Sequence, residues 1–92
     1  MNGRRKIVIG GELHLSLQVV AECYRVELGW LRDACEIGLL VGRRENNEIV
    51  IAAGTMDRVA EIVRLHVYYR LDLQAITLLL GRPDRELDHE SI

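Results

Sequence analysis

The sequence contains no phenylalanine, one tryptophan, one proline and two cysteines among its 92 residues. Aromatic residues make up only 4% of the chain, so leucine, isoleucine and valine have to fill the core. No apolar run approaches the roughly 20 residues of a membrane-spanning helix. Cys23 and Cys35 are too few for a disulfide framework or a four-ligand zinc site, and we expect both to be small core residues. These absences favour one small domain in the cytoplasm.

The charge balance separates classes of function. The chain carries 12 basic and 14 acidic residues, which gives a net charge of −2. Domains that hold nucleic acid mainly through phosphates are usually basic, so this balance disfavours nucleic-acid binding. No nucleophile stands beside a base and an orienting group, and no glycine-rich phosphate loop is present. We therefore expect no enzymatic activity, no cofactor and no metal.

Two stretches of alternating residues predict β-hairpins. Residues 6–15 contain two short stretches in which polar and apolar residues alternate, one on each side of Gly10 and Gly11. This glycine pair suits a tight turn because glycine adopts positive φ freely. Residues 39–43 and 48–51 are mainly apolar and flank a polar, asparagine-rich turn. A hairpin in this second position, after two helices, would be a wing.

Four segments with apolar residues spaced three and four apart predict amphipathic helices. The first begins after Ser16 and the last after Asp72, because both side chains can cap a helix N-terminus. Only a tight corner near Arg25 separates the first two helices, which is helix-turn-helix spacing. A domain over 1–82 and a polar, mobile tail over 83–92 are expected. The expected helices cover about 17–24, 27–37, 55–70 and 73–80.

Several of these segments resemble a known family. Residues 17–26, Leu-Gln-Val-Val-Ala-Glu-Cys-Tyr-Arg-Val, resemble the first helix and turn of MerR-type winged helices. Leu31-Arg32 and Gly38-Leu39-Leu40 resemble that family's Leu-Arg pair and its helix exit, and residues 71–76 are similar to its short capped helix. The resemblance covers residues 15–80. It implies a mainly α fold, a MerR-like winged helix-turn-helix of four helices with a small antiparallel sheet.

The departures from that family narrow the resemblance. DNA-binding members tend to carry basic residues at the start of the second helix and an arginine- and tyrosine-rich wing, followed by a long dimerising coiled coil. Here the second helix offers Glu27, Gly29 and Asp33, and the coiled coil is absent. This short, non-basic form resembles the CbpM-type chaperone modulators, to which DafA is related. The resemblance implies a modulator that binds the J-domain of a DnaJ- or CbpA-type co-chaperone and inhibits it.

Trp30 is the sharpest candidate for a partner-binding residue, because tryptophan is enriched in interface hot spots. Helical spacing places it beside a predicted core leucine, towards the outer face. The other interpretation is that Trp30 closes the edge of the core against the third helix. Nearby acidic residues could form a rim that complements the basic helix of a J-domain, or simply a solvated face. These residues are Glu22, Glu27, Asp33 and Glu36.

The alternative function is a small MerR-like DNA-binding regulator or an excisionase-like protein. Arg32 on the second helix, with Arg43 and Arg44 in the hairpin, would then contact nucleic acid. Arg32 could instead pair with a nearby acid. A carboxylate about 4 Å from a phosphate costs on the order of 1–4 kcal/mol, which opposes this function. Residues 78–80, all leucine, leave open a homodimer seam or a helix end packed on the first strand.

Overall fold

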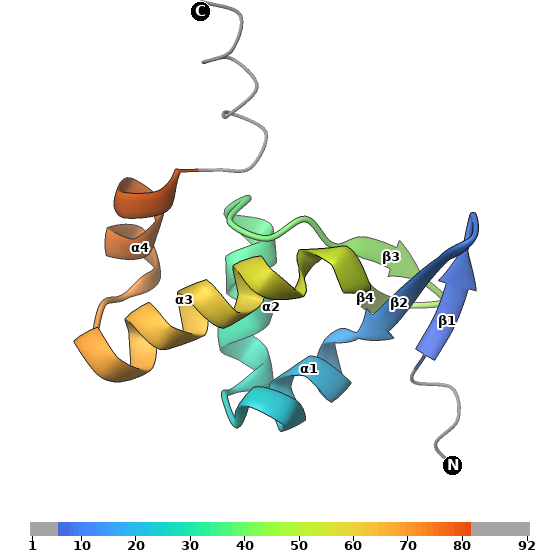
Figure 1. Cartoon of the computed structure of the whole chain (residues 1–92), viewed down its shortest axis with the longest axis horizontal. Helices are drawn as coiled ribbons and strands as arrows, with labels where there is room; N and C mark the ends of the chain where they lie inside the picture. The colour runs from blue at the N-terminus through green and yellow to red at the C-terminus, as the bar shows by residue number, and fades with distance from the viewer. Residues whose placement is uncertain (1–5, 82–92) are drawn as a thin grey trace, which may run out of the picture.

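The computed structural model describes residues 6–81, and the elements below lie within that range. Figure 1 shows the strands at one end of the molecule, α4 at the other, and α3 running between them. Within residues 6–81, no helix is both long enough and apolar enough to cross a membrane. The elements in chain order are β1 (Lys6–Ile9), β2 (Glu12–Ser16), α1 (Leu17–Tyr24), α2 (Leu28–Glu36), β3 (Arg43–Glu45), β4 (Glu48–Ala52), the 3-10 turn η2 (Ala53–Thr55), α3 (Met56–Tyr69) and α4 (Leu73–Leu80).

The four strands form one antiparallel sheet in the order β1-β2-β4-β3. The first predicted hairpin is confirmed, and a second hairpin forms as predicted, but its first strand is Arg43–Glu45 and not residues 39–43, because Leu39 and Leu40 are buried in the core before the strand begins. Gly10 and Gly11 turn the first with φ of 60° and 83°, and Asn46 and Asn47 turn the second with φ of 50° and 67°. Positive φ at both central residues matches the right-handed twist of the strands, and glycine and asparagine adopt it most readily. The two hairpins therefore have the local chemistry of two-residue turns.

The predicted fold class, a mainly α MerR-like winged helix-turn-helix with a small accessory sheet, is wrong. Two strands come first among the described elements, and β2 pairs with β4 through Leu15 and Ile51, so the second hairpin is part of a four-stranded sheet in which β4 is an inner strand. The helices are packed against a sheet that is a main part of the architecture, which is an α+β arrangement.

Local capping explains where the helices begin and end. Ser16 Oγ accepts a hydrogen bond from the Val19 backbone N–H at 3.2 Å, and Asp72 Oδ1 accepts one from the Ala75 N–H at 2.9 Å. Both caps match the sequence prediction. The corner after α1 is made by Arg25 in the left-handed conformation, with φ of 58°. This corner turns the chain sharply and brings α2 back against α1.

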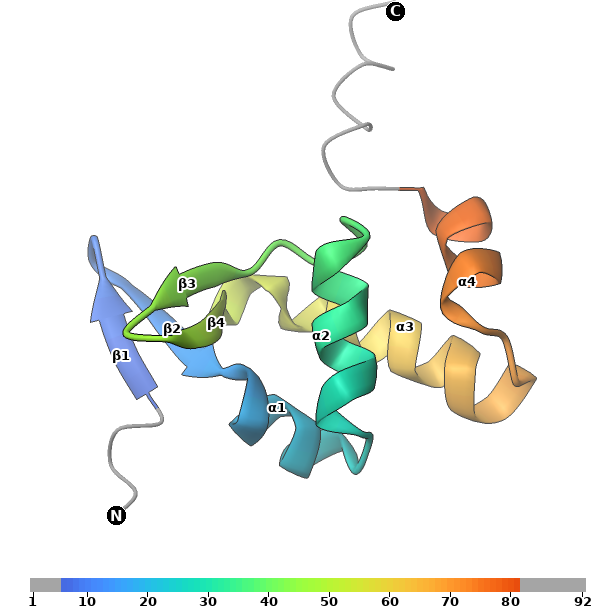
Figure 2. The ribbon, with the colours of Figure 1, turned by 180° about the vertical axis from the view of Figure 1, so that it is seen from behind.

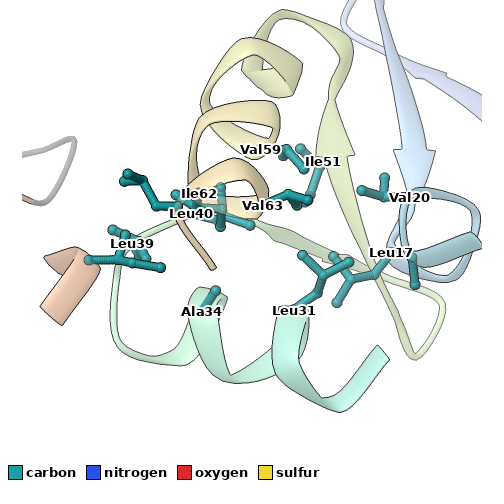
Figure 3. Close-up of a cluster of buried hydrophobic side chains, with 13 residues drawn as sticks. Leu17, Val20, Leu31, Ala34, Leu39, Leu40, Ile51, Val59, Ile62 and Val63 are labelled. Atoms are coloured by element: carbon teal, nitrogen blue, oxygen red, sulfur yellow. The ribbon is translucent and has the colours of Figure 1, made fainter. Parts of the chain in front are cut away.

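The core lies where α1, α2 and α3 meet the sheet. Figure 3 shows Leu31 and Ala34 of α2 pointing towards the side chains of α1 and α3, and both are fully buried. This burial fixes the rotation of α2, so its opposite face is exposed to solvent. The largest fully buried side chains are Leu31, Leu39, Leu40, Ile51, Ile62, Ile76, Val20 and Val59.

A half-buried arginine ties the last helix to the rest of the domain. Arg58 of α3 donates from Nε to the Leu39 carbonyl at 3.3 Å and from Nη2 to the Gly81 carbonyl, just after α4.

Leu78 and Leu79 of α4 remain 88% and 62% exposed. Because α4 and β1 lie at opposite ends of the molecule (Figure 1), the interpretation that this helix end packs on the first strand is wrong. The predicted tail over 83–92 lies outside the described residues.

Candidate functional site

A groove of about 640 Å³ lies where the corner between α1 and α2 faces α3. We call it the Trp30 groove. Trp30 from α2 and His66 from α3 contribute ring surfaces to it, and Val67, which is 48% exposed, extends the apolar wall. Glu22 of α1 and Glu27 before α2 supply carboxylates. The groove therefore combines an aromatic and apolar wall with acidic side chains, a composition suited to protein contacts.

The aromatic wall of the groove is held in a defined geometry. Trp30 stacks on His66 with ring centroids 4.4 Å apart and planes inclined by 24°. His66 Nδ1 donates to the Leu71 backbone carbonyl at 3.0 Å, which fixes the orientation of the imidazole. His66 is thus partly buried, and its ring nitrogen has a hydrogen-bond partner. Trp30 is half-buried: it closes the edge of the core against α3, and its remaining surface lines the groove.

The structure brings together only part of the predicted acidic rim. Glu22 and Glu27 line the Trp30 groove, together with one cation, Arg25. Asp33 and Glu36 are exposed on α2 but do not line it. Of the four predicted partner-binding residues Trp30, Glu27, Asp33 and Glu36, the groove thus contains the first two.

The three arginines named for nucleic-acid contact have different surroundings. Arg43 donates from Nε to Glu45 Oε2 at 2.8 Å, so its charge is compensated on its own strand. Arg32 and Arg44 are exposed, and neither forms an ion pair with any residue between 6 and 81. The interpretation that Arg32 pairs with a nearby acid is therefore wrong over this range. Both side chains line a second pocket, of about 370 Å³.

The two cysteines lie on neighbouring helices with unequal exposure. Cys23 of α1 is exposed, so its prediction as a core residue is wrong, whereas Cys35 of α2 is half-buried and packs against the core. Burial raises the pKa of the Cys35 thiol, and the negative charge of Glu36 raises it further. Among the described residues, no group of three or more histidine, cysteine, aspartate or glutamate side chains could hold a metal ion.

Sequence reasoning missed the groove itself, although packing of Trp30 against the third helix was one of its two interpretations and is confirmed by the stack on His66. His66 and Val67 line the groove because α3 packs across the α1–α2 corner, and nothing in the local spacing of residues indicates which residues of α3 lie there. It also missed the second pocket, which joins Arg32 of α2 to Arg44 of β3. The arginines were named individually, but their convergence depends on how the hairpin packs against the helices.

Comparison with protein-family models, curated protein sequences and solved structures returned no significant match to this chain. Its function has to be argued from its own residues.

Proposed function

We propose that this protein is a non-enzymatic binding module that takes up a cationic partner surface in the Trp30 groove. The observation that carries the proposal is the position of Trp30, half-buried, stacked on His66, and flanked by the carboxylates of Glu22 and Glu27. A ring held in place loses little conformational freedom on binding, which favours tryptophan as an anchor. The carboxylates would steer a basic surface towards it.

The partner we propose is the J-domain of a DnaJ- or CbpA-type co-chaperone in the cytoplasm. This identification comes from the resemblance of the sequence to CbpM-type chaperone modulators, whose partner presents a basic helix. Binding would cover the surface through which the J-domain engages DnaK, and the co-chaperone would be inhibited. The carboxylates of Glu22 and Glu27 in the Trp30 groove support this choice, because a negatively charged groove complements a basic helix.

The exposed face of α2 argues against insertion of this helix into a DNA groove. Glu27, Asp33 and Glu36 are all exposed on or beside α2, and Arg32 is the one exposed guanidinium on that helix. A polyanion approaching this face would meet three carboxylates for each guanidinium. Repulsion of that kind costs on the order of 1–4 kcal/mol for each close contact.

Calorimetric titration of the full chain with purified J-domains tests the proposal. We expect saturable binding at physiological salt, weakened about threefold or more in Glu27→Gln because a charge next to the anchor is lost. Glu48→Gln is the matched control: it removes the same charge from the hairpin, away from the Trp30 groove. Absence of binding to both DnaJ- and CbpA-type J-domains would refute the partner. Equal losses in the two variants would refute the groove.

A further inference from the structure

A second pocket lies between the N-terminal parts of α1 and α2 and the β3–β4 hairpin. The net charge of its lining side chains is positive, whereas that of the Trp30 groove is negative. We call it the arginine pocket. In Figure 2 the hairpin lies to the left of α2, and α1 lies beneath both. Arg32 reaches the pocket from α2 and Arg44 from β3, with the amides of Gln18 and Asn47 completing its polar lining. Its volume of about 370 Å³ is in the range of small-ligand pockets.

Arg32 and Arg44 line one pocket, and neither is paired with an acidic side chain among the described residues. Glu48, the single carboxylate lining the pocket, is exposed and forms no ion pair with a described residue either. Positive charges that line one pocket repel each other, and a bound anion would offset that repulsion. Arg44 contrasts with its neighbour Arg43, whose charge is already paired with Glu45 at 2.8 Å.

Further donors face the same pocket. Ser16 lines it and is 3% exposed; its Oγ accepts from the Val19 N–H, and its own O–H has no acceptor among the described residues. The first turn of α1 carries no acidic side chain, so the positive end of this helix adds to the potential, whereas α2 begins after its N-cap residue Glu27, whose carboxylate offsets the positive end of that helix. These contributions support the arginine pair and would not define a site alone.

We infer that the arginine pocket binds a phosphate-type oxyanion carried by a small molecule. A phosphate monoester carries about −1.5 to −2 charges at neutral pH, which matches two guanidinium groups better than a single carboxylate does. Arginine also meets phosphate oxygens in a bidentate geometry. The remaining oxygens would accept from Ser16, Gln18 and Asn47. This site does not depend on the Trp30 groove, and failure of either proposal leaves the other standing.

The test is calorimetric titration of the full chain with inorganic phosphate and with pyrophosphate, at constant ionic strength. We expect one site per chain. Arg32→Ala and Arg44→Ala should each weaken it about tenfold or more, because each removes charge-assisted hydrogen bonds. Arg32→Lys, which keeps the charge and loses the planar fork, should fall between wild type and Arg32→Ala. Arg43→Ala is the matched control, with the same charge change on the same strand, and should stay within roughly twofold.

Three results would overturn this inference. The first is no binding of either anion, and the second is an equal loss in Arg43→Ala, which would indicate a diffuse charge effect. The third is binding of a duplex oligonucleotide through Arg32 and Arg44 without binding of free phosphate or pyrophosphate, which would assign the pocket to a nucleic-acid backbone. Because both arginines are exposed and form no ion pair in the described chain, the variants should keep the thermal midpoint of the wild type.

Discussion

The indole of Trp30 and the imidazole of His66 stack across the interface between α2 and α3, with ring centroids 4.4 Å apart. This contact makes one face of the tryptophan part of the fold and leaves the rest of the ring to the groove. Binding and stability are therefore coupled at this residue, and variants of the two partners separate them. Trp30 supplies the proposed anchor, whereas His66 chiefly orients it.

Trp30→Ala is expected to weaken J-domain binding by about 2 kcal/mol or more, since it removes the anchor of the groove. It should also lower the free energy of unfolding by roughly 0.5–1.5 kcal/mol beyond the loss of buried area, because the ring stack is lost. Calorimetry measures the first effect and denaturant unfolding the second. His66→Ala serves as the control, because it breaks the same stack and keeps the indole. Unchanged affinity in Trp30→Ala would remove Trp30 from the site.

The salt dependence of binding should separate a protein partner from nucleic acid. A complex that neutralises about six phosphates loses roughly a thousandfold in affinity between 50 and 200 mM salt. The J-domain complex should weaken far less, because its anchor is apolar and only a few charges flank it. Titrations with a J-domain and with a duplex oligonucleotide at both salt concentrations give the two slopes. A steep slope for the J-domain would contradict an aromatic anchor.

Two glycines provide a matched test of the packing. A Cβ on Gly42 would lie 2.8 Å from Ile49 Cγ2 and 3.2 Å from Cys35 Sγ, while a Cβ on Gly29 would meet nothing within 4 Å. Ile49 is β-branched and has little freedom to move aside. We expect Gly42→Ala to lower the free energy of unfolding by about 1–3 kcal/mol. Gly29→Ala, within a helix, should raise it by roughly 0.5–1 kcal/mol. Denaturant unfolding checks both, and equal effects would contradict the close approach at Gly42.

The two thiols should react at different rates. Because burial and Glu36 raise the pKa of Cys35, its folded-state thiol is protonated at neutral pH and becomes the reactive thiolate only at higher pH. Cys23 is exposed. We expect iodoacetamide to modify Cys23 before Cys35 at neutral pH. The rate of modification at Cys35 should increase only when the pH is raised further. Peptide mass spectrometry measures the extent of modification at each cysteine. In denaturant the two sites should react alike, and equal rates in the folded protein would contradict this prediction.

The homodimer remains a prediction, and we expect its interface to involve α4. Leu78 and Leu79 are the most exposed leucines of this helix, at 88% and 62%. A dimer seam over α4 would bury both, so the double variant Leu78→Gln, Leu79→Gln should shift the protein to a monomer. Sedimentation equilibrium over a range of concentrations measures the change. A wild-type protein that sediments as a monomer throughout would contradict the seam.

The local segments of this protein could be read from its sequence. The caps Ser16 and Asp72 mark helix starts, and Gly10-Gly11 and Asn46-Asn47 mark hairpin turns, because each signal acts within a few residues of itself. The fold class could not be read in the same way. It depended on the pairing of Leu15 with Ile51, which joins strands separated by two helices. That pairing joined the hairpin predicted as a wing to a four-stranded sheet, with β4 as an inner strand and β3 at the edge.

The same distinction between local signals and contacts of distant segments applies to the candidate sites. Residue types and net charge alone singled out Trp30 and its acidic neighbours and opposed nucleic-acid binding, because these properties belong to individual side chains. Packing decided that His66 supports the indole, that Asp33 and Glu36 do not line the groove, and that Arg32 meets Arg44 in one pocket. Contacts between distant segments form only when helices and sheet bury a common core, and local sequence patterns carry no record of that arrangement.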